Sequence, residues 1–311
     1  MSRLNSSTHE NLTDSIIKNL FSKGIFTDFD FINKDTKLLS KITGFSFKRI
    51  VEIKNEFSEF RGGCTTIVGA DYYENETVFT SGILNLDKLL GGGFYSNQIY
   101  EFCGASSAGK TQLCLSIATN IALEKNYVVH YIDTKGDYSV TRVVQILNAK
   151  NCSDEDIVRV LMNIKVTKIT NSKGIFSILN YLGNITKEEF KTKLLIIDSL
   201  STFCLTSTAK TETMYSLIHL KNMIRFITNE FNIPVITTNL VTQWTEENPL
   251  KNGVNVTIFK PTLGKFWYTV PNTRILLKYL KDEEREISIW QSVDFKIGTF
   301  CNLNITSTGF S

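Results

Sequence analysis

Eight residues from Gly104 to Thr111 carry the clearest chemical signal in this chain. They fit the pattern G-x-x-x-x-G-K-[ST], in which backbone N–H groups of a glycine-rich loop surround phosphate. In that pattern Lys110 reaches the β- and γ-phosphates, and the hydroxyl of Thr111 holds Mg²⁺. We therefore predict a phosphate loop that binds ATP and Mg²⁺ and consists of Gly104, Ala105, Ser106, Ser107, Ala108, Gly109, Lys110 and Thr111.

The residues on both sides of this loop predict the elements that hold it. Ile99–Cys103 is a short apolar run typical of a buried strand, and apolar residues at helical spacing predict a helix over Lys110–Lys125. A loop that leads into a helix N-terminus offers unpaired backbone N–H groups, and these groups together with the helix dipole favour an anion. A glycine-rich turn without chemistry does not account for both flanks.

A second group expected at such a site follows another apolar strand. Leu194–Ile197 leads into Asp198, whose carboxylate we predict to orient Mg²⁺ together with Thr111. Cleavage of a nucleotide also needs a group that orients or deprotonates water. We expect that group at the end of the strand neighbouring the phosphate loop, within Tyr131–Asp137.

Strands and helices alternate from Ser81 onward, which predicts an α/β fold with a mainly parallel sheet and helices on both faces. Strands are predicted at Ile99–Cys103, Val128–Ile132, Ile164–Ile169, Leu194–Ile197 and Val235–Thr238. Helices are predicted at Lys110–Lys125, Val140–Ala149, Ile175–Leu182 and Thr213–Phe231. The tail differs, because its apolar runs predict antiparallel strands that extend the sheet: Thr273–Leu280, Ile287–Gln291 and Thr299–Thr306.

The first part of the chain has a different pattern. Residues 1–60 contain four short helical patterns, and Leu39–Ser46 resembles the turn of a helix–hairpin–helix, which can touch DNA phosphate through backbone N–H groups. This segment has nine basic and eight acidic side chains, so its charge favours protein docking over DNA binding. We predict a small helical domain over 1–60, a linker over 61–80 and a nucleotide-binding core over 81–311.

Composition limits the function classes. The chain has 311 residues, of which 42% are hydrophobic and 21% charged, and a net charge of +3, which is too small for a basic nucleic-acid arm. Any DNA contact must therefore come from a local patch. The six cysteines form no C-x-x-C pair, and we interpret Cys103 and Cys114 as buried free thiols. We expect neither a signal peptide nor a membrane span, since no stretch has the required apolar length.

Several segments together resemble the RecA-type recombinases. They are Ser81–Gly93 before the phosphate loop, Tyr131–Thr134, the strand that ends in Asp198, and Val235–Asn239. Two further segments, Gly69–Tyr73 and Gly264–Leu277, resemble in particular the D-type paralogues among the eukaryotic recombinases. The resemblance runs over nearly the whole chain and implies a RecA-like ATPase core.

This resemblance also implies a role in homologous recombination and in the repair of DNA damage in the nucleus. Members of the family bind ATP between neighbouring subunits, and D-type paralogues work in a heteromeric assembly that assists the recombinase. We therefore expect other recombinase paralogues, the recombinase filament and single-stranded DNA as partners. Arg142 matches the arginine that stacks on adenine in active relatives.

Two residues depart from the pattern of active relatives. Lys135 stands where those relatives carry a glutamate, and a lysine with a reference pKa of about 10.4 cannot accept a proton from water at neutral pH. It can instead pair with the γ-phosphate. Leu240 stands where they carry a glutamine that senses that phosphate. We assign no catalytic residue and expect ATP to be bound more than hydrolysed; the alternative is that Asp133 or Asp137 replaces the glutamate.

In the recombinase family two loops face DNA, and here they correspond to Thr202–Thr211 and Gln243–Lys260. Lysines and an aromatic residue suit contact with a phosphate backbone and stacking on bases, although Glu246 and Glu247 weaken the positive field. We predict modest, salt-sensitive binding of single-stranded DNA; the alternative is that both are surface loops only. The candidate DNA-binding residues are Lys210, Trp244, Lys251 and Lys260.

Three functions therefore remain open. The favoured one is an ATP-binding regulatory subunit of a recombination-repair complex. The second is an active DNA-dependent ATPase or strand-exchange protein, against which Lys135 and Leu240 argue. The third is a scaffold that works without ATP, against which the intact Lys110, Thr111 and Asp198 argue.

Overall fold

A computed structural model describes residues 4–5, 9–61, 77–124, 127–185, 189–201, 210–247 and 255–311. The chain forms two compact units, Met1–Glu74 and Asn75–Ser311, which we call the N-terminal unit and the core unit. No helix within the described ranges combines the length and the apolarity needed to cross a membrane.

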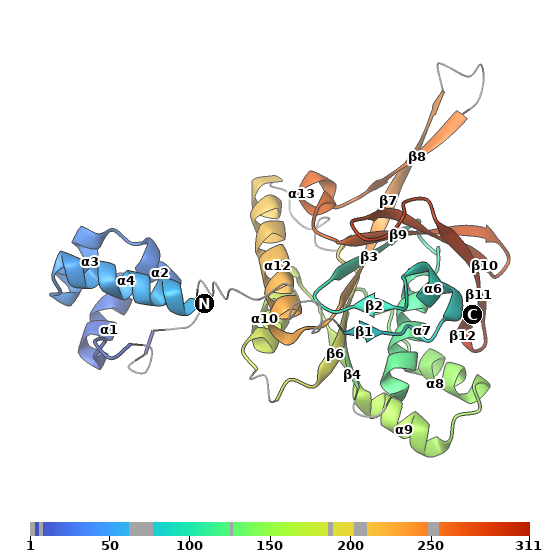
Figure 1. Ribbon diagram of the computed structural model, residues 1–311, viewed down its shortest axis with the longest axis horizontal. Coiled ribbons are helices and arrows are strands. Elements are labelled where there is room, and N and C mark those ends of the chain that lie inside the picture. The colour runs from blue at the N-terminus through green and yellow to red at the C-terminus, as the bar shows by residue number, and fades with distance from the viewer. Residues whose placement is uncertain are drawn as a thin grey trace. The chain divides into compact units, whose positions relative to one another are not determined.

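The N-terminal unit is a group of short helices around its own apolar core (Figure 1). Thr27 and Asp30 form a reciprocal capping box that starts the second helix, and Gly44, with φ of 77°, ends the third. The turn resembling a helix–hairpin–helix is therefore the connection between the third and fourth helices. The helices are α1 Asp14–Ser22, α2 Asp28–Asn33, α3 Thr36–Thr43 and α4 Phe47–Arg61.

The core unit is built on one large sheet. Among the described residues, ten strands form it in the order β12-β11-β10-β9-β3-β7-β6-β4-β5, with β8 paired to β7. The strands from β9 to β5 in that order run parallel, and β9 to β12 pair antiparallel. Strands β1 Val78–Phe79 and β2 Phe94–Tyr95 form a separate pair.

The sheet strands are β3 Ile99–Gly104, β4 Val128–Asp133, β5 Ile164–Lys168, β6 Thr192–Asp198, β7 Val235–Glu247, β8 Asn255–Pro261, β9 Thr273–Lys281, β10 Glu284–Ser292, β11 Phe300–Thr306 and β12 Gly309–Phe310. The core-unit helices are α6 Leu84–Leu89, α7 Lys110–Leu123, α8 Val140–Ala149, α9 Asp154–Asn163, α10 Ser172–Gly183, α12 Lys210–Phe231 and α13 Gly264–Tyr268.

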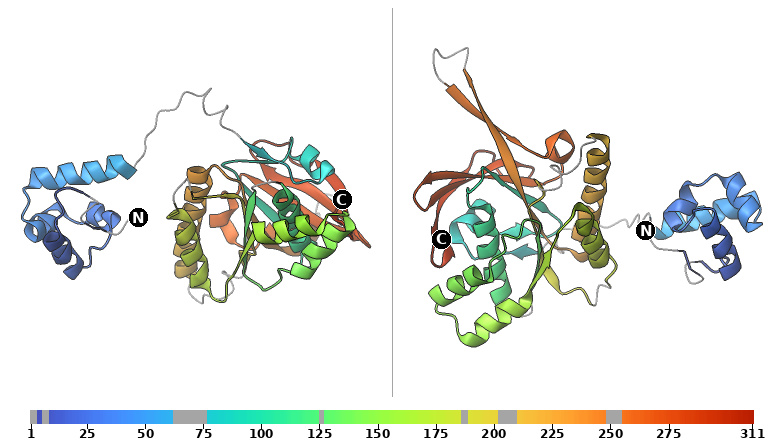
Figure 2. Two further views of the ribbon diagram at one scale, coloured as in Figure 1. Left: turned by 90° about the horizontal axis from the view of Figure 1, so that it is seen from below. Right: turned by 180° about the vertical axis from the view of Figure 1, so that it is seen from behind.

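Helices cover both faces of this sheet (Figure 2). Successive residues of a strand point to opposite faces, so Leu194 and Ile196 join the apolar core under α7, α8 and α9, while Leu195 and Ile197 join the one under α10, α12 and α13. A strand buried on both faces explains the continuous apolar run in the sequence. The predicted α/β fold with a parallel centre and an antiparallel end is confirmed.

One predicted strand is much longer than expected. β7 continues past Thr238 to Glu247, because Val241–Glu247 pairs antiparallel with β8 instead of with the rest of the sheet. The two strands extend beyond the sheet as a hairpin (Figure 1). The prediction of a loop over Gln243–Lys260 is therefore wrong for its described residues, which lie in this hairpin.

Candidate nucleotide-binding site

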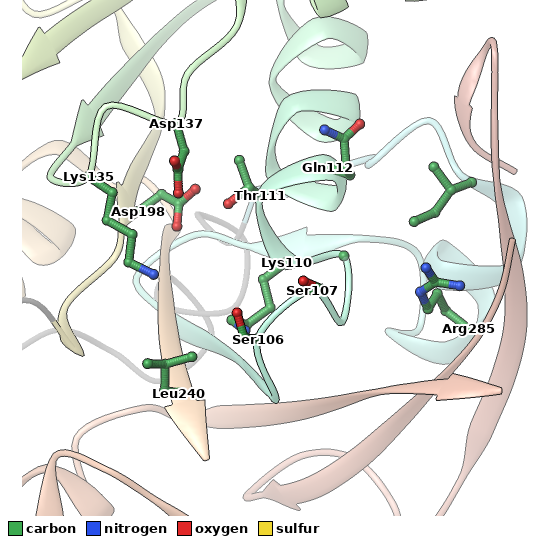
Figure 3. A pocket seen from close by; sticks show the side chains of 12 residues that line it. Ser106, Ser107, Lys110, Thr111, Gln112, Lys135, Asp137, Asp198, Leu240 and Arg285 are labelled. Carbon is green, nitrogen blue, oxygen red and sulfur yellow. The ribbon is translucent and has the colours of Figure 1, made fainter. Parts of the chain in front are cut away.

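A cavity of about 390 Å³ opens where several parallel strands end (Figure 3). Six of the ten residues predicted to bind the nucleotide line it, and Gly104, Ala105, Ala108 and Arg142 do not. The lining residues that the sequence singled out come from the loop after β3 and the start of α7, from the loop after β4, from the end of β6, and from the point where β7 leaves the parallel part of the sheet. The lining residues are Ser106, Ser107, Gly109, Lys110, Thr111, Gln112, Lys135, Asp137, Asp198, Leu240, Arg285 and Ile305. We call Gly104–Thr111 with Asp198 the phosphate wall, and Lys135, Asp137 and Leu240 the opposite wall.

Close packing behind the phosphate wall requires its glycines. A Cβ on Gly104 would lie 2.7 Å from the carbonyl oxygen of Leu277, which real Cβ atoms do not tolerate. Gly109 has φ of 101°, and a Cβ there would lie 3.1 Å from the ring of Phe310. The loop is thus fixed by β9 on one side and by the chain's C-terminal strand on the other.

Lys110 is buried at the base of the phosphate wall. Its ammonium group donates hydrogen bonds to the carbonyl oxygens of Gly104, at 2.9 Å, and Ala105, at 2.7 Å. An ammonium group has three donors, so one remains for a ligand in the cavity. Burial, and after it the positive charge of Lys135, lower the pKa of Lys110 to about 8, while the negative charge of Asp198 opposes the shift.

Asp198 is 3% exposed and is held by two hydroxyl groups from neighbouring strands. Tyr131 donates a hydrogen bond to its Oδ2 at 2.8 Å, and Thr238 donates one to its Oδ1 at 2.6 Å. Burial and the nearby Asp198 raise the pKa of Tyr131, so the phenol stays a donor. Each carboxylate oxygen keeps a further lone pair. Together with the Thr111 hydroxyl, these oxygen atoms suit Mg²⁺, a hard cation that prefers oxygen ligands.

The loop after β4 is organised by Asp133, which is almost fully buried. Its Oδ1 accepts hydrogen bonds from the backbone N–H groups of Lys135, Gly136 and Asp137, at 3.1, 2.7 and 3.2 Å. Its Oδ2 accepts a fourth from Tyr138 at 3.1 Å. Asp133 is not among the residues that line the cavity. Of the two acids considered as substitutes for the missing glutamate, only Asp137 therefore reaches the site.

The opposite wall lies nearer to solvent. Lys135 and Asp137 are exposed, and Leu240 is half-buried. Figure 3 shows the Lys135 side chain reaching into the space between Asp198 and the phosphate loop. A cation and a hydrocarbon therefore form part of this side of the cavity.

Sequence reasoning missed three lining residues. Gln112 follows the phosphate-loop pattern directly and could have been included on that basis. Arg285 and Ile305 come from β10 and β11, and no local pattern marks them. Arg285 is 7% exposed; its Nη1 donates to the carbonyl oxygens of Asp282 and Glu284 at 2.9 and 3.0 Å, and its guanidinium lies 4.6 Å from the centre of the Tyr279 ring.

Arg142, predicted to stack on adenine, does not itself line the cavity. Its Nε donates to Oε1 of Gln112 at 2.9 Å, and its Nη2 donates to the carbonyl oxygen of Thr306 at 2.5 Å. The arginine thus lies beside the end of the cavity formed by Gln112 and Ile305. Contact with a base stays a prediction.

Of the residues predicted to bind DNA, those that the structure describes are not among the residues that line the cavity. Lys210 is the first residue of α12, and Trp244 and Lys260 lie in the β7–β8 hairpin, with Lys260 exposed. Lys251 and residues 202–209 fall outside the described residues. Cys103 and Cys114, interpreted as buried free thiols, are both free and buried.

The strand order, the phosphate loop between β3 and α7, and the antiparallel strands at the C-terminal end together define a RecA-like core. A family model described as Rad51 matches residues 74–311, and a second, described as RAD51D, N-terminal domain, matches residues 1–55. The chain therefore belongs to the Rad51 family.

Curated relatives agree with this assignment. The chain is 30% identical over 285 residues to the mouse DNA repair protein RAD51 homolog 4, covering 86% of this chain and 81% of the mouse protein. It is 28% identical over 281 residues to the bovine protein of the same name, covering 86% and 82% of the two chains. It is also 25% identical over 321 residues to the human DNA repair protein RAD51 homolog 2, covering 90% and 82%.

Proposed function

We propose that this chain is an ATP-binding subunit of the machinery that repairs DNA by homologous recombination. It binds Mg·ATP at the phosphate wall, hydrolyses it slowly, and assists the recombinase as part of a heteromeric complex of recombinase paralogues. One observation carries this proposal. Lys110, Thr111 and Asp198 meet at one cavity whose opposite wall holds Lys135 and Leu240 in place of the glutamate and glutamine expected in active relatives.

The phosphate wall supplies the binding groups. Backbone N–H groups of the loop and the N-terminus of α7 surround the phosphates, and Lys110 offers its third donor to the β- and γ-phosphates. Thr111 and Asp198 supply oxygen ligands for Mg²⁺, which neutralises phosphate charge when bound. Arg142, beside Gln112, stacks on the adenine base of the nucleotide.

The opposite wall supports slow turnover. Hydrolysis needs a group that accepts a proton or a hydrogen bond from the attacking water, and the ammonium group of Lys135 has three donors but no acceptor. Leu240 has no polar atom with which to sense a phosphate. Asp133 cannot replace the missing base from its present position, because four backbone N–H groups occupy its carboxylate.

Asp137 supports a second candidate, an active DNA-dependent ATPase. Its exposed carboxylate lines the cavity two residues beyond the position of the expected glutamate. A carboxylate there can act as a base only if it reaches the water on the far side of the γ-phosphate. Substitution of this one side chain separates the two candidates.

Partners and DNA complete the proposal. The relatives are named as DNA repair proteins and RAD51 homologs, which supports other paralogues and the recombinase filament as partners and the nucleus as location. We propose modest binding of single-stranded DNA through α12 and the β7–β8 hairpin, with Lys210, Trp244, Lys251 and Lys260 as contacts. Lysines that can contact the phosphate backbone of DNA, together with an aromatic residue that can stack on bases, support this binding mode.

The test compares binding with turnover in the same preparation. Calorimetry of the full-length chain, alone and with its paralogue partners, is expected to detect Mg·ATP binding, and a phosphate-release assay with single-stranded DNA is expected to detect little hydrolysis. Hydrolysis near that of active recombinases that disappears in Asp137→Ala would instead establish the second candidate. Absence of any nucleotide binding would refute the proposal.

A scaffold that works without ATP is tested by Lys110→Ala. Loss of the ammonium group is expected to abolish nucleotide binding and to weaken assembly with the partners, as measured by co-purification with and without Mg·ATP. A variant that no longer binds nucleotide but assembles as well as the wild type would favour the scaffold.

A further inference from the structure

Lys135 is held in place by its backbone while its side chain stays free to bind. The backbone N–H groups of Lys135 and Gly136 both donate to Asp133, and Gly136, with φ of 82°, permits the turn. The Lys135 side chain is exposed and lines the cavity. Among the described residues it forms no salt bridge within 4.0 Å, and it shares the cavity with the carboxylates of Asp137 and Asp198.

The cavity has two distinguishable ends. Gln112, Ile305 and Arg285 form one end, next to Arg142, where apolar and planar groups suit a base and ribose. Thr111 and Asp198 form the other, where their oxygen atoms would hold a Mg²⁺ ion that neutralises phosphate charge. A nucleotide whose base lies at the first end and whose phosphates lie along the phosphate loop therefore directs its terminal phosphate toward the opposite wall.

Lys110 and Lys135 lie at different positions along the path from the base of the nucleotide to its terminal phosphate. Lys110 is tied to the carbonyl oxygens of Gly104 and Ala105, at the base of the loop, and serves the phosphates that lie in the loop. Lys135 approaches from the loop after β4, which two strands, β7 and β6, separate from β3 in the sheet. Only the phosphate farthest from the base extends toward it.

On the basis of the proposed function, we infer that Lys135 makes this cavity selective for a nucleoside triphosphate over the diphosphate. Its ammonium group pairs with the γ-phosphate, a charge-assisted contact that a diphosphate cannot make. Lys135, which stands in place of the expected glutamate, thereby distinguishes the triphosphate from the diphosphate. The complex is then sensitive to the ratio of ATP to ADP while it consumes little ATP.

The experiment measures the affinities of the full-length chain for ADP and for a non-hydrolysable ATP analogue, both with Mg²⁺. The wild type is expected to prefer the triphosphate. Lys135→Ala and Lys135→Gln are each expected to reduce that preference about tenfold, through weaker triphosphate binding at unchanged ADP affinity. Lys168→Ala is the matched control, because Lys168 is an exposed lysine at the end of neighbouring β5 that does not line the cavity.

The outcomes separate this inference from the proposal beneath it. If the wild type binds neither nucleotide, the proposed function fails. If the wild type binds both and the Lys135 variants keep its preference, only the inference fails. If the variants weaken both nucleotides equally, or if Lys168→Ala has the same effect, Lys135 contributes only a general positive field, and the inference is likewise overturned.

Discussion

The phosphate wall and the opposite wall face the same cavity but are built in different ways. In the phosphate wall, Lys110 and Asp198 are buried and each makes two internal hydrogen bonds, and a side chain at Gly104 would collide with the backbone of β9. In the opposite wall, Lys135 and Asp137 are exposed, and Leu240 is half-buried.

Because of this difference, binding and hydrolysis can be separated in one fold. Substitutions in the phosphate wall disturb buried hydrogen bonds and close packing, so they affect folding as well as ligands. Substitutions among exposed residues of the opposite wall change charge at the cavity with little effect on packing. A site can therefore lose the groups for hydrolysis and keep those for binding.

The largest effect is expected when the opposite wall is rebuilt. In the double variant Lys135→Glu with Leu240→Gln, phosphate release at saturating ATP should rise about a hundredfold, because a positioned general base contributes at least that factor. Steady-state phosphate release with single-stranded DNA and partners measures it. Nucleotide affinity should fall, since a carboxylate then faces the γ-phosphate. If phosphate release stays at the wild-type rate even at saturating ATP, the phosphate wall also lacks a group that hydrolysis requires.

In the loop after β4, the buried Asp133 should contribute more to stability than the exposed Asp137. Asp133→Ala removes the acceptor of four backbone N–H groups and should lower the free energy of unfolding by about 2 kcal/mol. Denaturant titration measures it. Asp137→Ala, in the same loop but exposed, is the control and should change stability by less than about 0.5 kcal/mol. Equal losses in both variants would contradict the role given to Asp133.

In the phosphate wall, the metal contribution should be separable from phosphate binding. Thr111→Val keeps the shape of the side chain but removes an oxygen ligand, so affinity for ATP in Mg²⁺ should fall about tenfold. Affinity for ATP in EDTA should stay unchanged. Calorimetry under both conditions tests this, and an equal loss in both would mean that Thr111 acts through the loop and not through the metal.

Local patterns marked several residues that the structure brings together. The spacing from Gly104 to Thr111 and the apolar run before Asp198 lie within short stretches of sequence, and the structure brings them to one cavity. Helix α9 was missed although its start carries a local signal. Ser153 caps it by accepting a hydrogen bond from the N–H of Asp156, and three acids occupy its first turn.

Other parts of the site depend on pairing between distant segments. Arg285 and Ile305 reach the cavity only because β9, β10 and β11 add to the sheet beside β3. The extension of β7 depends on β8, since Val241–Glu247 has no other partner strand among the described residues. The role of Asp133 depends on loop geometry, because an aspartate that ends a strand can face a ligand or cap the loop. No single stretch of sequence contains this information.

The smallest expected effect concerns His130 in β4, the strand that leads to the opposite wall. Its ring nitrogen lies 2.9 Å from the hydroxyl of Thr167, and burial, helped by the charge of Lys165, lowers the pKa of His130 to about 4. In the unfolded chain its pKa is about 6.5. The unfolded state therefore takes up a proton first as the pH falls below that value, and folding stability is lost progressively toward pH 4.

At pH 6 this linkage should cost about 0.8 kcal/mol relative to pH 8, where both states are neutral. His130→Gln removes the titration but keeps a polar group opposite Thr167, so the variant should lose less stability than the wild type over this range. Denaturant titrations of both proteins at pH 8 and pH 6 give the difference. If both lose the same amount, the acid sensitivity over this range arises elsewhere than at His130.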